Sequence, residues 1–130
     1  MHLDAVGIIS RDISQSRAFY ALFGLTFQAI GGTDHWEATT PSGVRIMLDS
    51  VALMKKLHPE WVEPTGCGMT LCFKQESPEQ VDALFARITD AGFKEITRPW
   101  DAFWGQRYAT VHDPDGNQID LFATLPEGSE

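Results

Sequence analysis

The sequence predicts an α+β fold of two tandem βαβββ modules that form a curved mixed sheet around a cleft, with the helices outside. Two observations predict it. Both halves of the chain run strand, helix, strand and hairpin in the same order, and a shift of 73 residues lays "PSGVRIML" over "PDGNQIDL". The matched pairs are Pro41 with Pro114, Gly43 with Gly116, Ile46 with Ile119, and Leu48 with Leu121. An internal duplication explains both observations, and helices of such modules cover the outer sheet faces.

The first module begins with "LDAVGIIS" at 3–10, a short apolar run with β-branched residues that predicts a buried strand. A helix follows, with Asp12 or Ser14 as its N-cap and Gly24 as its end. The β-prone run "LTFQAI" comes next, and a hairpin of "HWEATT" and "PSGVRIML" closes the module. The helical spacing of apolar residues rests on Phe19, Leu22 and Phe23.

The second module repeats this order, starting with the apolar strand "MTLCF" at 69–73. Its helix is the best-determined element, because Ser77 is a natural N-cap, Pro78 suits the first helical position and Gly92 supplies a left-handed end. The strand "FKEITR" and the hairpin of "RYATVH" and "PDGNQIDL" follow. One apolar stripe of the helix is formed by Val81, Leu84, Phe85 and Ile88.

A length of 130 residues fits a single domain of this kind. Within it we expect module one at 1–60 and module two at 67–125. The stretch "MKKLHPEWVEPTG" is rich in turn-forming residues, so residues 61–66 are expected to be a linker. The tail, 126–130, is expected to fray.

The composition excludes several classes of function. A net charge of −8 repels phosphate backbones, and the few Lys and Arg residues form no basic stripe, so nucleic acid is not an expected partner. No apolar run approaches the length of a membrane span, and the N-terminus lacks the pattern of a signal peptide, which predicts no membrane partner and a cytoplasmic location. Cys67 and Cys72 have neither redox nor zinc spacing and are expected to be buried thiols.

The closing "DPDGNQIDLF", together with the opening strand and helix, resembles the vicinal oxygen chelate superfamily, which includes glyoxalase I, extradiol dioxygenases and bleomycin-resistance proteins. The resemblance covers nearly the whole chain. In its metal-dependent members, His, Glu or Gln side chains from the first and fourth strands of each module bind the ion. The matching positions here hold Ala5, Met47, Thr70 and Asp120. Since a divalent ion needs several donors, we expect a cleft without a metal and no cofactor.

Without an ion, the chain is poorly equipped for the metal-assisted reactions of that superfamily. The sequence has no nucleophile elbow, P-loop or Rossmann glycine pattern. His2 is terminal, His58 lies in the linker, and His35 and His112 occupy strands without forming a ligand-spaced pair. No catalytic residue is therefore predicted, and an enzyme is the less favoured interpretation.

Three aromatic residues precede the final hairpin: Trp100, Phe103 and Trp104. The "WG" pair there resembles the bleomycin-resistance branch, whose members sequester drugs unaltered. The rings would then stack against a planar ligand, and the net negative charge favours a cationic one. Core packing or a dimer contact is an equally good explanation for any single Trp. Trp104 is the best candidate because Gly105 follows it.

Four further residues complete the expected ligand-binding set. Arg107 either anchors an anion or pairs with a carboxylate, and the pairing is favoured. Asp120 either faces an apolar cleft, where it needs a partner, or meets water on the other face of its strand. Met47 suits an adaptable apolar wall or simple core filling, and Thr70 occupies the position of a family ligand.

The leading hypothesis is a glyoxalase/bleomycin-resistance-like protein that sequesters a small aromatic molecule. A metal-dependent lyase or dioxygenase of the same superfamily is the first alternative. A ligand sensor or protein-interaction module is the second, because fold alone does not choose among them. Exposed strand edges and a half-open cleft favour a homodimer.

Overall fold

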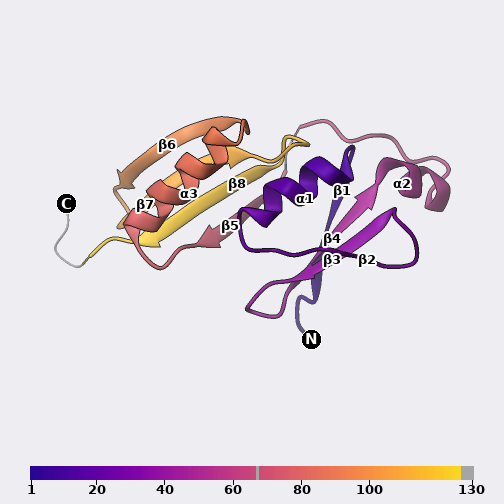
Figure 1. The fold of residues 1–130 in the computed structure, drawn as a ribbon, viewed down its shortest axis with the longest axis horizontal. Helices are drawn as coiled ribbons and strands as arrows, with labels where there is room; N and C mark the ends of the chain where they lie inside the picture. The colour runs from indigo at the N-terminus through magenta and orange to yellow at the C-terminus, as the bar shows by residue number, and fades with distance from the viewer. Residues whose placement is uncertain (67, 127–130) are drawn as a thin grey trace. The chain divides into compact units, whose positions relative to one another are not determined.

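The computed structural model describes residues 1–66 and 68–126. It has the expected α+β architecture, and its described residues form two four-stranded mixed sheets and three helices. The chain divides into two compact units, Met1–Thr65 and Gly66–Glu130 (Figure 1). The tandem-module fold is thereby confirmed, while the shared cleft between the modules stays a prediction.

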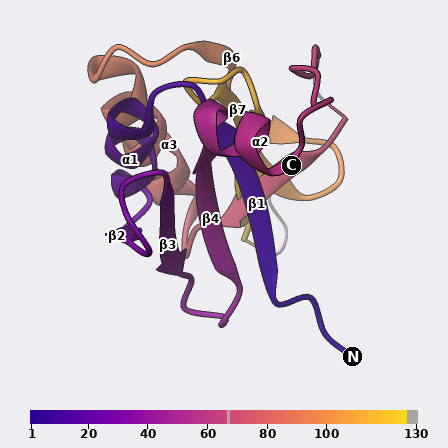
Figure 2. The same cartoon turned by 90° about the vertical axis from the view of Figure 1, so that its right-hand side faces the viewer.

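Unit 1 contains a sheet with the strand order β1-β4-β3-β2. β1 and β4 run parallel, and β4, β3 and β2 are antiparallel neighbours (Figure 2). Its elements are β1 (Ala5–Ser10), α1 (Ile13–Ala21), β2 (Gln28–Ala29), β3 (His35–Thr39), β4 (Arg45–Ser50) and α2 (Val51–Leu57). The expected first-module order is present, followed by one additional helix.

α1 begins where the sequence predicts it, because the Asp12 side chain accepts a hydrogen bond from the Gln15 backbone N–H at 3.1 Å. The helix is shorter than its apolar pattern suggests: it ends at Ala21, and Phe19 and Tyr20 are its fully buried rings. Ser16 also faces the sheet, where its hydroxyl lies 2.6 Å from that of Ser10 on β1. This buried pair satisfies two hydroxyls that would otherwise be desolvated without a partner.

α2 was not predicted from the sequence, and it lies within residues 1–60, the range expected for module one. Val51–Leu57 form a helix whose N-cap, Ser50, accepts a hydrogen bond from the Leu53 backbone N–H at 3.0 Å. None of its residues is buried. Its apolar residues Val51, Met54 and Leu57 have helical spacing, but the helix is only seven residues long and its periodic signal is correspondingly short.

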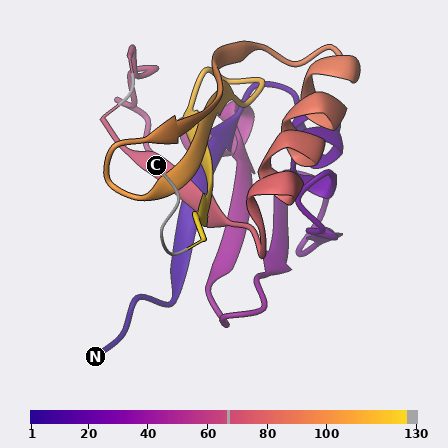
Figure 3. The ribbon, with the colours of Figure 1, turned by 90° about the vertical axis from the view of Figure 1, so that its left-hand side faces the viewer.

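Unit 2 has the corresponding strand order β5-β8-β7-β6, with β5 parallel to β8. α3 packs on one face of this sheet, against β6, β7 and β8 (Figure 3). The predicted Ser77 cap, Pro78 and four-residue apolar stripe are all confirmed, and the chain leaves the helix through Gly92 at φ +91°. Its elements are β5 (Thr70–Lys74), α3 (Pro78–Asp90), β6 (Glu95–Ala102), β7 (Gln106–His112) and β8 (Gln118–Thr124).

The strand registers repeat between the units. Ala5 pairs with Arg45 in unit 1, and Thr70 pairs with Gln118 in unit 2. The 73-residue shift carries Arg45 to Gln118 and therefore Met47 to Asp120, so these two residues occupy equivalent positions. The internal repeat inferred from the sequence thus extends to backbone pairing.

The "DPDGN" turn that joins β7 and β8 is organised by one buried carboxylate. Asp113 accepts hydrogen bonds from the backbone N–H groups of Asp115 at 2.9 Å and Asn117 at 2.8 Å, and from the Asn117 side-chain amide at 2.8 Å. Gly116 takes φ +84°, which side-chain-bearing residues rarely adopt. The turn therefore sets the register of the hairpin that carries Asp120.

The expectation of two buried thiols is wrong for Cys72, which is exposed. Cys72 alternates along β5 with Leu71 and Phe73, which are half-buried, so it projects from the face that α3 does not cover. Cys67 lies outside the described residues. Among the described residues, no helix combines the length and the apolar character needed to cross a membrane.

Candidate functional site

The two faces of the unit 2 sheet differ in chemistry because side chains alternate along each strand. The helix face carries buried apolar residues of β7 and β8, among them Val111, Ile119 and Leu121. We call the opposite side the open face. On β8 it carries Gln118, Asp120 and Phe122, which neighbour Thr70, Cys72 and Lys74 of β5.

Five rings form a continuous group on this side, which we call the aromatic row. Trp104 contacts three of them edge-on, with ring centroids 5.5 Å from Trp100, 4.9 Å from Phe103 and 5.3 Å from Tyr108. Tyr108 in turn stacks on Phe122 at 6.1 Å. Trp100, Tyr108 and Phe122 lie side by side on β6, β7 and β8, whereas Phe103 and Trp104 lie in the turn between β6 and β7.

Much of the aromatic row is accessible to a ligand. Trp100 is 40%, Trp104 47% and Phe103 92% exposed. The Trp104 indole N–H is occupied, since it donates to the Gln106 side-chain oxygen at 2.8 Å. Gly105 follows at φ +88°, as the tight turn requires. Trp104 and Phe103 therefore offer ring surface rather than hydrogen-bonding groups.

Asp120 is connected to the row through Tyr108 and is only 6% exposed. It accepts hydrogen bonds from the Tyr108 hydroxyl at 2.6 Å, the Thr110 hydroxyl at 2.9 Å and the Gln118 amide at 3.4 Å. Within the described part of the chain, every hydrogen-bond partner of Asp120 is uncharged. Asp120 therefore has the partners that a buried carboxylate needs, but no cation neutralises it.

The Tyr108 pKa is raised well above its usual range by burial and by the hydrogen bond to Asp120. The phenol consequently keeps its proton and donates it at neutral pH. The thiol of Cys72 also has a raised pKa, first from desolvation of the sulfur and then from the nearby Asp120 charge, although its hydrogen bond with Tyr108 acts in the opposite direction. These two residues and Thr110 surround the carboxylate with protonated neutral groups.

The structure brings together four of the predicted ligand-binding residues on or beside the open face of unit 2: Trp100, Phe103, Trp104 and Asp120. Thr70 lies on the same face at the edge of the sheet, next to Gln118. Met47 belongs to unit 1, where it lies on β4.

Arg107 is not part of this group. Its guanidinium lies on the helix face, where it makes two hydrogen bonds to Asp82 of α3, at 3.0 and 3.2 Å, and one to Asp101 at 3.1 Å. These carboxylates raise the Arg107 pKa. The pairing that the sequence favoured is present, and the side chain is directed away from the aromatic row.

Sequence reasoning missed Tyr108, Thr110 and Phe122. A signal for the first two was available, because a hairpin turning at Asp113–Asn117 places Thr110 opposite Asp120, and Tyr108 lies two residues farther along the same face. Phe122 likewise follows Asp120 by two residues. The hydrogen bond between Tyr108 and Asp120 required the side-chain conformations as well.

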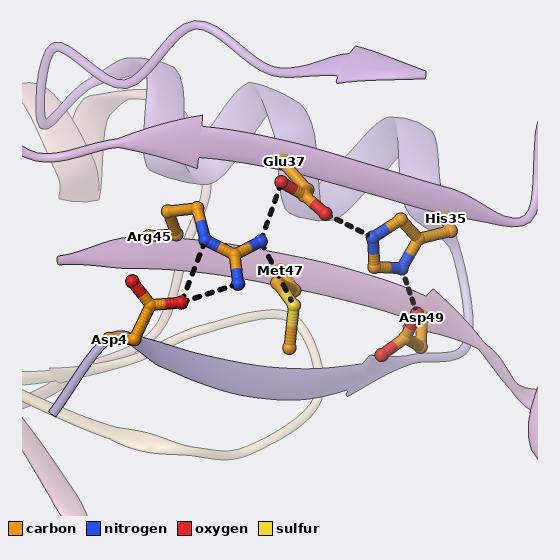
Figure 4. Close-up of polar contacts among 6 residues, drawn as sticks. All are labelled: Asp4, His35, Glu37, Arg45, Met47 and Asp49. Carbon is orange, nitrogen blue, oxygen red and sulfur yellow. Dashed lines mark hydrogen bonds and ion pairs between the residues drawn. The ribbon is translucent and has the colours of Figure 1, made fainter. Parts of the chain in front are cut away.

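Unit 1 carries a different group on the equivalent face of its sheet, which we call the charge network (Figure 4). Arg45 donates to Asp4 at 2.7 Å and to Glu37 at 2.8 Å. His35 continues the chain, with Nε2 2.6 Å from Glu37 and Nδ1 hydrogen-bonded to Asp49. Alternation places these residues together: His35 and Glu37 on β3 face Asp49 and Met47 on β4.

The two carboxylates raise the pKa of His35, with Asp49 the larger influence and Glu37 the second. His35 in turn lowers the pKa of Glu37, with Arg45 contributing further. An imidazolium donates from both ring nitrogens and has no lone pair for a metal. The sequence predicted that His35 is a strand histidine and not a metal ligand; the structure places it in β3 and gives it two acidic partners that the sequence did not predict.

The positions that the resemblance assigns to metal ligands do not fit a metal ion. Ala5 supplies a methyl group and Met47 a thioether that lies 3.8 Å from the Arg45 guanidinium. Thr70 supplies only a hydroxyl, and the Asp120 oxygens already accept three hydrogen bonds. Across residues 1–66 and 68–126, no three His, Cys, Asp or Glu side chains form a group able to hold a metal ion.

Comparison with known proteins agrees with the fold and the module order. The family model of the Glyoxalase/Bleomycin resistance protein/Dioxygenase superfamily matches residues 2–121. A crystal structure of a glyoxalase/bleomycin resistance protein/dioxygenase family enzyme from Burkholderia phytofirmans PsJN is 24% identical and superposes with a TM-score of 0.86, covering 96% of this chain and 100% of that one. A glyoxalase-related enzyme from Fulvimarina pelagi is 18% identical, with a TM-score of 0.81 and coverage of 95% and 88%.

Curated relatives cover less of the chain. An uncharacterized protein of Mycobacterium bovis is 38% identical over 58 residues, which are 45% of this chain and 38% of that protein. A counterpart in Mycobacterium tuberculosis has the same identity over 34% of its own length. The match therefore spans little more than a third of these relatives.

Proposed function

Because the chain belongs to the Glyoxalase/Bleomycin resistance protein/Dioxygenase superfamily, we propose that it binds and sequesters a small planar aromatic molecule on the open face of unit 2, without a metal. The observation that carries this proposal is the aromatic row, in which Tyr108 contacts the exposed Trp104 ring and donates its hydroxyl to the buried Asp120 carboxylate. Three large rings that are 40% to 92% exposed contribute little to the packing of a core, and a cluster of exposed apolar side chains is typical of a binding surface.

Stacking supplies the main affinity in this proposal. Each ring pair contributes about 0.5–1.5 kcal/mol beyond the burial of apolar area. Contact with Trp100 and Trp104 together therefore accounts for about 1–3 kcal/mol plus the area term. The uncompensated Asp120 charge and the net charge of −8 both favour a cationic ligand.

The proposal predicts that Trp104→Ala weakens binding of 1-methylquinolinium, a planar cation, by about five- to tenfold, the equivalent of about 1–1.4 kcal/mol. Trp104 is half-exposed, so the melting temperature should change little. Quenching of tryptophan fluorescence, checked by calorimetry, measures the affinity. Trp61→Ala is the matched control, because it removes one tryptophan outside the aromatic row and should leave the affinity unchanged.

Unchanged affinity in a folded Trp104→Ala protein would remove Trp104 from the site. If neither 1-methylquinolinium nor a broad set of neutral planar compounds binds or raises the melting temperature, sequestration is wrong and the sensor or protein-interaction alternative gains support.

The metal-dependent lyase or dioxygenase alternative is separated from sequestration by metal analysis. Its ligands would have to come from positions other than Ala5, Met47 and Thr70, whose side chains do not suit a divalent ion. We expect the purified protein to hold no stoichiometric zinc, nickel, manganese or iron, and its melting temperature to be unaffected by EDTA. A stoichiometric metal that is lost on Asp120→Ala would contradict the proposal.

A cytoplasmic homodimer completes the proposal. Each sheet has strand edges, formed by β1 and β2 in unit 1 and by β5 and β6 in unit 2, where backbone groups are open to pairing. Sedimentation velocity should give a mass of twice 14.5 kDa. A single species at 14.5 kDa across micromolar concentrations would rule the dimer out.

A further inference from the structure

We propose that the open face of unit 2 selects cations that carry no N–H donor, such as a quaternary ammonium or an N-alkylated aromatic ring, over primary ammonium ions. Tyr108 is the residue that sets this specificity. The inference rests on the proposed function and names the class of ligand that the aromatic row accepts.

The first step concerns the Asp120 carboxylate, which attracts a cation without offering it a hydrogen bond. Its Oδ2 accepts the Tyr108 hydroxyl at 2.6 Å, and its Oδ1 accepts Thr110 at 2.9 Å and Gln118 at 3.4 Å. The residue is 6% exposed, so the phenol and its neighbours cover it. The Coulombic attraction between the carboxylate and a ligand cation acts across the intervening side chains, whereas a hydrogen bond between them requires direct contact.

The second step concerns what the ligand does contact. Trp100, Phe103 and Trp104 present ring surface, and ring faces attract cations electrostatically. The one indole N–H of Trp104 is already donated to Gln106 at 2.8 Å. A ligand over these rings therefore meets π surface, and Tyr108 connects that surface to the Asp120 charge. Aromatic faces are the groups by which quaternary ammonium ions are recognised.

The third step concerns the cost of entry. A primary ammonium brings three N–H donors that are hydrogen-bonded to water before binding. Over the aromatic row these donors would lose water without gaining the carboxylate as acceptor, and such unpaired donors are costly. A trimethylammonium group has no N–H donors, so no hydrogen bond with water is lost when it binds. Its attraction to the Asp120 charge and to the ring faces is not reduced by that cost.

The role of Tyr108 follows from its two functions. Its ring belongs to the aromatic row, with its centroid 5.3 Å from that of Trp104. Its hydroxyl donates a hydrogen bond to Asp120 Oδ2, so that this oxygen is not available to a ligand. Tyr108→Phe keeps the ring and removes the hydroxyl, which opens that oxygen to a ligand N–H. Tyr20→Phe is the matched control, because it removes the hydroxyl of the chain's other tyrosine, which lies in α1 of unit 1.

The experiment compares benzyltrimethylammonium, benzylammonium and neutral quinoline by calorimetry at pH 7. In the wild-type protein benzyltrimethylammonium should bind about fivefold or more tightly than benzylammonium. In Tyr108→Phe that ratio should fall at least about threefold, through tighter binding of benzylammonium, and in Tyr20→Phe it should stay at the wild-type value. Asp120→Asn should weaken both cations and leave quinoline unchanged.

The outcomes separate this inference from the proposed function. Equal or tighter binding of benzylammonium by the wild-type protein overturns the inference, as does an unchanged ratio in folded Tyr108→Phe. The proposed function survives either result provided that quinoline or either cation binds and that Trp104→Ala weakens it. If none of the three compounds binds, both fall. The wild-type comparison needs no variant, so it tests the selectivity even if Asp120→Asn does not fold.

Discussion

At the scale of single residues, the same strand position carries different chemistry in the two units. The registers make Met47 equivalent to Asp120 and Glu37 equivalent to Thr110. In unit 1 the acidic groups around this position are paired with His35 and Arg45. In unit 2 the acidic group is surrounded by uncharged donors, which is why the ligand proposal concerns unit 2.

His35 should make the stability of the protein depend on pH. Its folded-state pKa is raised above the ordinary 6.5 by Asp49 and Glu37, so its contribution is fully present below pH 6.5 and is lost as the pH rises through the folded pKa. Glu37 has a lowered pKa, so its own contribution is present above the ordinary 4.5 and is lost as the pH falls through its folded value. The advantage of wild type over His35→Gln should therefore be greatest between pH 4.5 and 6.5 and decline as the pH rises through the folded pKa of His35.

Urea denaturation at a series of pH values measures this difference. The control repeats His35→Gln in a Glu37→Gln, Asp49→Asn background, where the maximum of this advantage between pH 4.5 and 6.5 should disappear because the acidic partners are gone. A stability difference that does not vary with pH in the native background would show that the imidazole packs there without being charged.

Arg107 should contribute to stability and not to ligand binding. Its guanidinium is bound to Asp82 and Asp101 on the helix face, and the carboxylates are half-exposed. Arg107→Ala should therefore lower the free energy of unfolding by about 0.5–1 kcal/mol and leave the affinity for 1-methylquinolinium at the wild-type value. Chemical denaturation and calorimetry on the same preparation measure the two quantities. A marked loss of affinity in the folded variant would return Arg107 to the site.

At the scale of elements, the helices show which sequence features are sufficient to predict a helix. α3 has a cap, a proline at its first turn and a buried stripe, and all of these were predicted. α2 has a cap but no buried residue, and it was missed. A helix of seven residues offers fewer than two turns of apolar spacing, which is too short a pattern to stand out beside the preceding strand.

The Ser77 cap is expected to be the main local determinant of the start of α3. Its side chain accepts a hydrogen bond from the Gln80 backbone N–H at 3.2 Å. Ser77→Ala should lower the free energy of unfolding by about 1 kcal/mol, because the first-turn N–H loses its acceptor. Urea denaturation measures the loss, and Ser77→Asp, which restores an acceptor, should recover most of it. Equal loss in both variants would mean that the hydroxyl acts in some way other than capping.

At the scale of the whole molecule, the charge of −8 should assist the binding of cations over a range longer than any contact. Raising the salt concentration from about 0.01 M to 0.5 M should weaken benzyltrimethylammonium about two- to threefold, because screening shortens the reach of the protein's charges. Quinoline, which is neutral, should bind equally at both. Calorimetric titrations at the two salt concentrations test this. Salt-independent binding of the cation would indicate that only the ring faces attract it.

The sequence by itself determined the order of the main strands and of α1 and α3, the internal repeat, the cap of α3, and the aromatic character of the segment around Trp104. Each of these depends on residues close together in the chain. Only the tertiary structure decided that Arg107 belongs to the helix face, that His35 is held between two carboxylates, and that Tyr108 covers Asp120. The physical reason is that hydrogen bonds between strands depend on register and side-chain conformation together, and a shift of one residue in register turns every side chain to the other face.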